Sequence, residues 1–174
     1  MSCKLNSLKL GDLDQYFGKG PDFFCDTGLT TANQNHCAHF VCHALNLRVG
    51  RPLCGDLKYA TRGRGVTMRV NDVFNYCTVK GSFGNDRKIP PPMAGFAAFF
   101  VVATLTDNIT AAGDQITMHD NPHKHVGIYL KGEVWNFSNS HHQVVRDKLH
   151  AFFSRMHHAY GTHTTFLYAY RQDI

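Results

Sequence analysis

Asn33-Gln-Asn-His-Cys-Ala-His-Phe-Val-Cys-His-Ala-Leu45 is the stretch that organises this chain, because a helix start and a buried helix face coincide in it. Asn33 and Asn35 are good helix caps, since a short amide side chain accepts from free backbone N–H groups. With Asn35 as the cap, Cys37 falls in the first turn, where the helix end favours a thiolate. The stripe of Phe40, Val41, Ala44 and Leu45 has helical spacing. The stretch therefore predicts a helix over residues 35–47, buried along one face, with an accessible thiol at its start.

The rest of the chain predicts one α+β domain over residues 1–174. Apolar spacing predicts further helices at 67–77 and 149–160, and a continuous apolar run predicts a buried strand at 95–104. Further strands are expected at 125–130, 133–138 and 164–170, and loops at 53–66, 81–92 and 105–122. Helices followed by mostly antiparallel strands indicate a cysteine-bearing helix packed on an antiparallel sheet.

Composition limits the function classes. Hydrophobic residues make up 43% of the 174 residues and charged residues 18%, which is typical of a globular protein. No apolar run approaches the roughly 18 residues of a membrane span, so no membrane insertion is expected. The formal net charge of +5 suits an anionic partner. The basic residues are dispersed and lack interleaved aromatic residues, so nucleic acid is not the expected partner.

The first residues contain no apolar segment of the kind that a signal peptide needs. The sequence therefore predicts a protein that is made in the cytoplasm without a signal peptide. The six cysteines show no CxxC spacing, and a cytoplasmic start argues against a disulfide framework. We expect five of them to be small buried core residues, and a single disulfide formed after export stays open.

The hairpin around residues 125–138 supplies a candidate base for Cys37. If Leu130 pairs with Glu133 across a two-residue turn, Gly127 lies opposite Asn136. Side chains alternate along a strand, so His125 and Asn136 are then diagonal neighbours on one face. The side-chain amide can hold the imidazole in the tautomer that serves the thiol.

Cys37, His125 and Asn136 are therefore the predicted catalytic residues of a thiol acyl-transfer site. Cys37 attacks a carbonyl carbon, His125 takes the thiol proton, and Asn136 orients the imidazole. Backbone N–H groups at the helix start, including that of Cys37, are expected to stabilise the oxyanion. The predicted mechanism requires no cofactor and no metal.

The histidines leave a second interpretation open. His36, His39 and His43 are candidate metal ligands, of which His39 and His43 stand four residues apart on one helix face, as zinc ligands can. His123 and His125 could add ligands from a strand. No glutamate follows the first histidine, so the pattern differs from that of a zinc-protease helix. A non-catalytic, His-rich, metal-binding module thus remains an alternative to the enzyme.

Several motifs resemble those of NlpC/P60 cysteine peptidases, within the papain-like and CHAP amidase clan. His-Cys37-Ala-His-Phe-Val is similar to the family's Asp-Cys-Ser-Gly-Phe-Val, and Gly95-Phe-Ala-Ala-Phe-Phe to its Gly-Asp-Leu-Val-Phe-Phe. His125-Val-Gly-Ile-Tyr-Leu matches the family's histidine strand closely, and Asn136 takes the place of the third polar residue. The departures are His36 in place of Asp, an amide in place of the commoner His, and a strand without its acidic residue.

The resemblance implies a papain-like fold and hydrolysis of peptidoglycan peptide bonds. A basic, single-domain member without a signal resembles type VI secretion amidase effectors. Such an effector passes through a secretion apparatus, acts in the periplasm of a target bacterium, and is blocked by a cognate immunity protein. An acyltransferase or deamidase of the same clan is the alternative activity.

Overall fold

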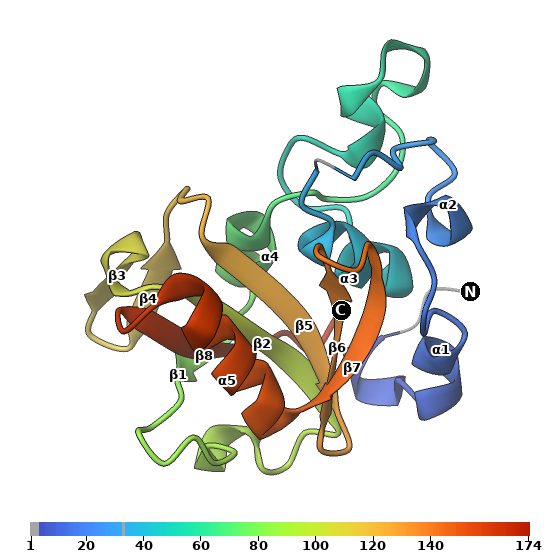
Figure 1. Cartoon of the computed structure of the whole chain (residues 1–174). Helices are drawn as coiled ribbons and strands as arrows, with labels where there is room; N and C mark the ends of the chain where they lie inside the picture. Colours follow the sequence, from blue (N-terminus) through green and yellow to red (C-terminus); the bar gives the residue numbers. More distant parts are fainter. Residues whose placement is uncertain (1–3, 33) are drawn as a thin grey trace.

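Six antiparallel strands form the main sheet of the computed structural model, which describes residues 4–32 and 34–174 (Figure 1). Their order across the sheet is β1-β8-β2-β5-β6-β7. The strands are β1 (Val79–Ser82), β2 (Ala98–Leu105), β5 (Lys124–Leu130), β6 (Glu133–Ser138), β7 (Gln143–Lys148) and β8 (Thr164–Tyr170). Two short strands, β3 (Ile109–Ala112) and β4 (Gln115–Met118), pair as a separate hairpin. The described chain is thus an α+β protein with an antiparallel sheet.

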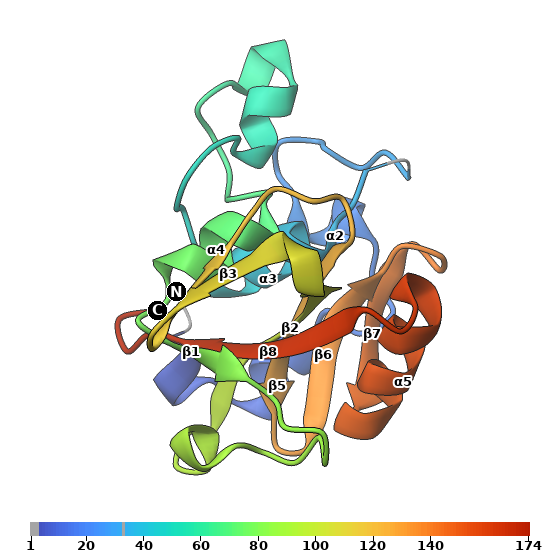
Figure 2. The same ribbon diagram turned by 90° about the vertical axis from the view of Figure 1, so that its left-hand side faces the viewer.

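The helices lie on the sheet in two groups. The α-helices are α1 (Leu10–Asp14), α2 (Pro21–Phe24), α3 (Cys37–Leu45), α4 (Val70–Tyr76) and α5 (Leu149–Tyr160). Short 3-10 turns are η1 (Leu5–Ser7), η2 (Cys54–Leu57), η3 (Tyr59–Thr61), η4 (Pro91–Met93) and η5 (Thr106–Asn108). Helix α3 packs against β5 and β6, and α4 packs against β5. Helix α5 lies along β7 and β8, apart from α3 and α4 (Figure 2).

The apolar run that predicted a buried strand forms the centre of the sheet. Strand β2 lies between β5 and β8, and its residues from Ala98 to Thr104 are buried. It begins three residues later than predicted, after the turn that follows η4. Helix α5 matches the predicted helix 149–160 and buries Phe152, Phe153 and Met156. Helix α5 packs against β2, and β5, which pairs with β2, packs against α3.

Other predicted boundaries were wrong. The region 105–122 is not one loop, because β3 and β4 form a hairpin there around Gly113. Both strands are only four residues long and mostly exposed, so they carry too little apolar pattern to be predicted as strands. Strand β1 overlaps the predicted loop 81–92, β7 was not predicted, and α4 starts at Val70 instead of residue 67.

The part of the chain that the structure describes contains no helix long and apolar enough to cross a membrane. The described cysteines, Cys25, Cys37, Cys42, Cys54 and Cys77, are all buried and free of disulfides. Burial was predicted for Cys25, Cys42, Cys54 and Cys77 but not for Cys37. Cys3 and the predicted cap Asn33 lie outside the described residues.

Candidate active site

Helix α3 begins at Cys37 itself, two residues later than predicted, because two asparagines hold the backbone just before it. The Asn35 side-chain oxygen accepts from the Cys37 N–H at 3.1 Å. The Asn139 side chain accepts from the His36 N–H at 3.3 Å and donates to Asn35 at 3.2 Å. The helix start is thereby tied to the β6–β7 turn. The Cys37 N–H, predicted as a free oxyanion donor, already donates to Asn35.

Cys37 is not the accessible thiolate that the sequence predicted. The residue is only 1% exposed, and its Sγ lies 3.9 Å from the Lys124 carbonyl oxygen at the start of β5. Burial raises the pKa of the Cys37 thiol to about 11. The N–H groups of Val126, Ala38 and Cys37 and the charge of Lys124 act in the opposite direction but do not outweigh it. Desolvation of the charged form therefore wins over the field of the helix end.

The predicted register of the hairpin is confirmed. Leu130 pairs with Glu133 and Gly127 with Asn136, so His125 and Asn136 share a face. The His125 Nε2 atom and the Asn136 side-chain oxygen lie 3.0 Å apart, and both residues are buried. Two of the three predicted residues are thus in direct contact.

Two residues that the sequence did not reveal fix the Asn136 amide. Arg155 of α5 donates to its Oδ1 at 2.8 Å, and its Nδ2 donates to an Asp147 carboxylate oxygen at 2.9 Å. A guanidinium only donates and a carboxylate only accepts, so the amide has one possible orientation. Its oxygen therefore faces His125, which must carry its proton on Nε2. The Nδ1 atom is left with the lone pair that a general base needs.

At neutral pH the candidate pair rests uncharged. Burial lowers the pKa of His125 to about 4; the hydrogen bond to Asn136 works against this shift and the charge of Arg155 adds to it. The Cys37 thiol and the His125 imidazole are then both neutral between these two pKa values. The two side chains therefore do not form a thiolate–imidazolium ion pair at rest.

Cys37 contacts the strand on both sides of His125. Among the described residues, the thiol's hydrogen-bond partner is the Lys124 carbonyl oxygen rather than the His125 ring. The Val126 N–H also lies close enough to stabilise the thiolate. The structure therefore brings Cys37 to the backbone that carries His125 without joining the two side chains.

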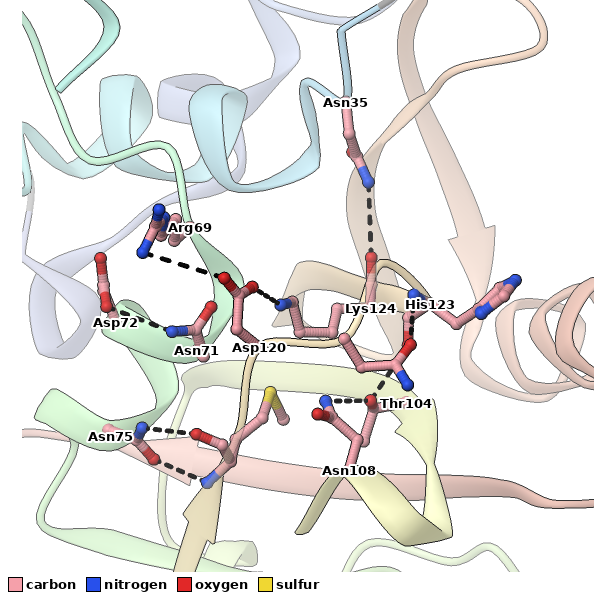
Figure 3. Close-up of polar contacts among 12 residues, drawn as sticks. Asn35, Arg69, Asn71, Asp72, Asn75, Thr104, Asn108, Asp120, His123 and Lys124 are labelled. Atoms are coloured by element: carbon pink, nitrogen blue, oxygen red, sulfur yellow. Dashed lines mark hydrogen bonds and ion pairs between the residues drawn. The ribbon is translucent and has the colours of Figure 1, made fainter. Parts of the chain in front are cut away.

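A network of polar contacts anchors this end of β5 (Figure 3). The Lys124 ammonium and the Asp120 carboxylate form an ion pair at 2.6 Å, although Lys124 is buried. Asn35 donates to the Lys124 carbonyl oxygen at 3.5 Å, which links the helix start to the strand. The Thr104 hydroxyl donates to the His123 carbonyl oxygen at 3.0 Å. Asn35 and Thr104 thus bond the backbone just before His125, and Asp120 holds the Lys124 side chain.

Tyr160, at the end of α5, lines a surface pocket. A pocket of about 530 Å³ is lined by Leu105, Thr106, Asp107, Tyr160 and His163. Burial raises the pKa of the Tyr160 phenol, and a charge on Cys37 would raise it further. The ring of Tyr160 also packs edge-on against His123, with ring centroids 5.4 Å apart.

The group of metal ligands that the sequence suggested is wrong, because His123 and His125 do not lie with His39 and His43. His125 is bonded to Asn136 and His123 packs on Tyr160, so neither joins His39 and His43. The partners of these two histidines are instead Cys25 and Cys54. All four residues offer ligand atoms within 4.8 Å of one another.

Five functional candidates could not be predicted from the sequence: Asp147, Arg155, Tyr160, Cys25 and Cys54. A charged pair at 147 and 155 is a usual surface feature, and no local pattern shows that the two meet over Asn136. The irregular spacing of Cys25, His39, His43 and Cys54 likewise matches no common metal motif.

Comparisons with protein-family profiles, with curated proteins and with solved structures give no match to this chain.

Proposed function

We propose that this chain is a cysteine amidase with a papain-like fold that resembles NlpC/P60 peptidases and hydrolyses peptide bonds of peptidoglycan. The observation that carries the proposal is the hydrogen bond between His125 and Asn136, made beside the backbone that Cys37 contacts. A cysteine at a helix start, a histidine on the adjacent strand and an amide that orients it form a thiol acyl-transfer constellation.

The residues act in a definite order in this mechanism. The Nδ1 atom of His125 takes the thiol proton as the Cys37 sulfur attacks the substrate carbonyl carbon. The imidazolium then gives that proton to the leaving amine, which yields an acyl-enzyme thioester and a free amine. Water, deprotonated by His125, hydrolyses the thioester and restores the thiol. The oxyanion competes with the Asn35 side chain for the Cys37 N–H during both attacks.

Asp147 and Arg155 act through Asn136. They hold its amide in the orientation that keeps the proton on His125 Nε2, and they touch no reacting atom. The buried thiol requires that substrate binding opens a path to it. We propose that this path runs from the pocket lined by Tyr160 and His163, and that the Tyr160 ring moves to open it.

Peptidoglycan is proposed as the substrate from the motif resemblance and from the net charge of +5, which suits an anionic wall. The same resemblance suggests delivery by a secretion apparatus into the periplasm of a target bacterium, and a cognate immunity protein that covers the site.

Digestion of purified sacculi tests the activity. The wild-type chain should release muropeptides with new amine termini, which mass spectrometry identifies. Cys37→Ala and His125→Ala should release none. The control Cys77→Ala, which changes a buried cysteine just after α4, should keep activity. Directed to the periplasm of a Gram-negative host, the wild type should lyse cells and Cys37→Ala should not.

One pair of results would contradict the peptidoglycan substrate. If the folded wild-type chain releases nothing from sacculi and is no more toxic than Cys37→Ala, the peptidoglycan substrate is wrong. Cys37-dependent deamidation or acylation of a protein or lipid would then identify the alternative activity of the same clan.

A further inference from the structure

We propose that Cys25, His39, His43 and Cys54 form a structural zinc site on the side of α3 that faces away from Cys37. Cys25 directly follows α2, His39 and His43 lie on α3, and Cys54 begins η2. At 100° per residue, the two histidines stand about 200° and 240° round the helix from Cys37. The proposed site is therefore distinct from the candidate active site.

The distances between the four ligand atoms fit the edges of a zinc tetrahedron. With Zn–S near 2.3 Å and Zn–N near 2.05 Å, these edges are about 3.8 Å for S–S, about 3.6 Å for S–N and about 3.3 Å for N–N. The structure has 4.0 Å between the sulfurs of Cys25 and Cys54. It has 3.7 Å from the Cys54 sulfur to His43 Nε2, and 3.2 Å between the Nε2 atoms of His39 and His43.

Hydrogen bonds prepare His39 to be a ligand. The Thr31 carbonyl oxygen can only accept, so His36 Nε2, at 2.9 Å from it, carries the proton. Neutral His36 then accepts through Nδ1 from His39 Nδ1, at 2.8 Å. This leaves the lone pair of His39 on Nε2, the atom that points into the cluster. Metal-binding histidines are oriented by such a bond at the other ring nitrogen.

The sulfur atoms are also prepared for the thiolate form. The Val66 N–H donates to the Cys54 sulfur at 3.3 Å, and the Thr27 hydroxyl lies 3.1 Å from the Cys25 sulfur and 3.5 Å from that of Cys54. A Cβ atom on Gly65 would lie 2.1 Å from the Cys54 sulfur, so only glycine fits beside it. Cys25, His39 and Cys54 are at least nine-tenths buried.

Charge and ligand type select the metal. Binding releases one proton from each thiol, and two thiolates with Zn²⁺ and two neutral imidazoles give a site of zero net charge, which can be buried at little cost. Two sulfur and two nitrogen ligands in a tetrahedron are typical of zinc. Four protein ligands leave no open position for substrate or water, so the role is structural. The ion would join the end of α2, helix α3 and the start of η2.

Metal content tests this proposal directly. The chain, produced without a polyhistidine tag in zinc-supplemented medium, should hold one zinc ion per molecule by inductively coupled plasma mass spectrometry. Cys25→Ala and His43→Ala should lose it. Cys77→Ala and His158→Ala, a buried cysteine and an exposed histidine outside the cluster, should retain it.

A second measurement covers variants that fail to fold. Cobalt added to the wild-type apo-protein should give the intense visible bands of a tetrahedral site and a thiolate-to-cobalt charge-transfer band. X-ray absorption of the zinc form should show two sulfur and two nitrogen neighbours. The proposal is overturned if the folded wild type takes up no zinc, if Cys25 and Cys54 form a disulfide in the zinc-supplemented protein, or if Cys25→Ala keeps its full zinc content. None of these readouts depends on hydrolysis.

Discussion

Acidification should destabilise this protein through His125. The folded state holds the pKa of this imidazole at about 4, whereas an unfolded chain leaves a histidine near 6.5. Between these values the unfolded state binds a proton that the folded state excludes. Stability is therefore fully present above about pH 6.5 and is lost as the pH falls towards about 4.

The size of the effect follows from the two pKa values. Each pH unit in this window costs about 1.4 kcal/mol, so the loss from His125 between pH 7 and pH 4 is about 3 kcal/mol. This is a large part of the 5–15 kcal/mol that typically stabilises a domain. The imidazole is almost fully buried, so solvent does not screen the effect away.

Urea unfolding at several pH values measures the loss, with His125→Gln as the test variant and His150→Gln as its control. Glutamine is uncharged and its amide can still donate, while His150 is exposed on α5. The wild type and the His150 variant should lose about 3 kcal/mol more than the His125 variant on going from pH 7 to pH 4. Equal losses, within about 1 kcal/mol, would show that His125 does not resist protonation and would refute the neutral resting pair.

Three further predictions concern the proposed reaction. The acid limb of kcat/KM should report an apparent pKa near 4, because His125 must be neutral to take the thiol proton; a limb near 6.5 would contradict the buried site. Asn136→Ala should lower kcat by about 10²-fold, a smaller loss than that of His125→Ala. Arg155→Met should also lower kcat by about 10²-fold, with little change in KM. If kcat is unchanged in both variants, Asn136 and Arg155 are not positioning residues. Tyr160→Ala should speed the alkylation of Cys37 by iodoacetamide at least about tenfold over Tyr160→Phe, measured by peptide mass spectrometry, and equal rates would show that the ring does not control access.

The hairpin that carries His125 and Asn136 could be predicted because its determinants are local. Apolar alternation defines both strands, and Lys131 and Gly132 take the positive φ values, 51° and 90°, of a two-residue turn. An even turn fixes which side chains share a face, so the contact between His125 and Asn136 follows from sequence alone. The burial of β2 and the helix at 149–160 were predictable for the same reason.

The state of Cys37 could not be predicted in this way. Its position at a helix start is local, and it indicated a thiolate. Its burial depends on where α3 meets β5, far along the chain, and that burial reverses the direction of the pKa. The partners of Asn136 and the companions of His39 are also set by tertiary packing between segments that carry no shared pattern.

Helix α3 carries residues of both the candidate active site and the proposed zinc site. Cys37 faces β5 on one side of this nine-residue helix, and His39 and His43 face Cys25 and Cys54 on the other. A helix this short is not stable by itself, so its position depends on what holds both faces. The β5 side supplies apolar contacts and the Lys124 carbonyl, and on the other side Phe24 packs on His39 and His43 beside the irregular segments before α3 and around η2. A metal ion there would fix those segments to the helix and so keep the Cys37 sulfur against the strand of His125, without taking part in the chemistry.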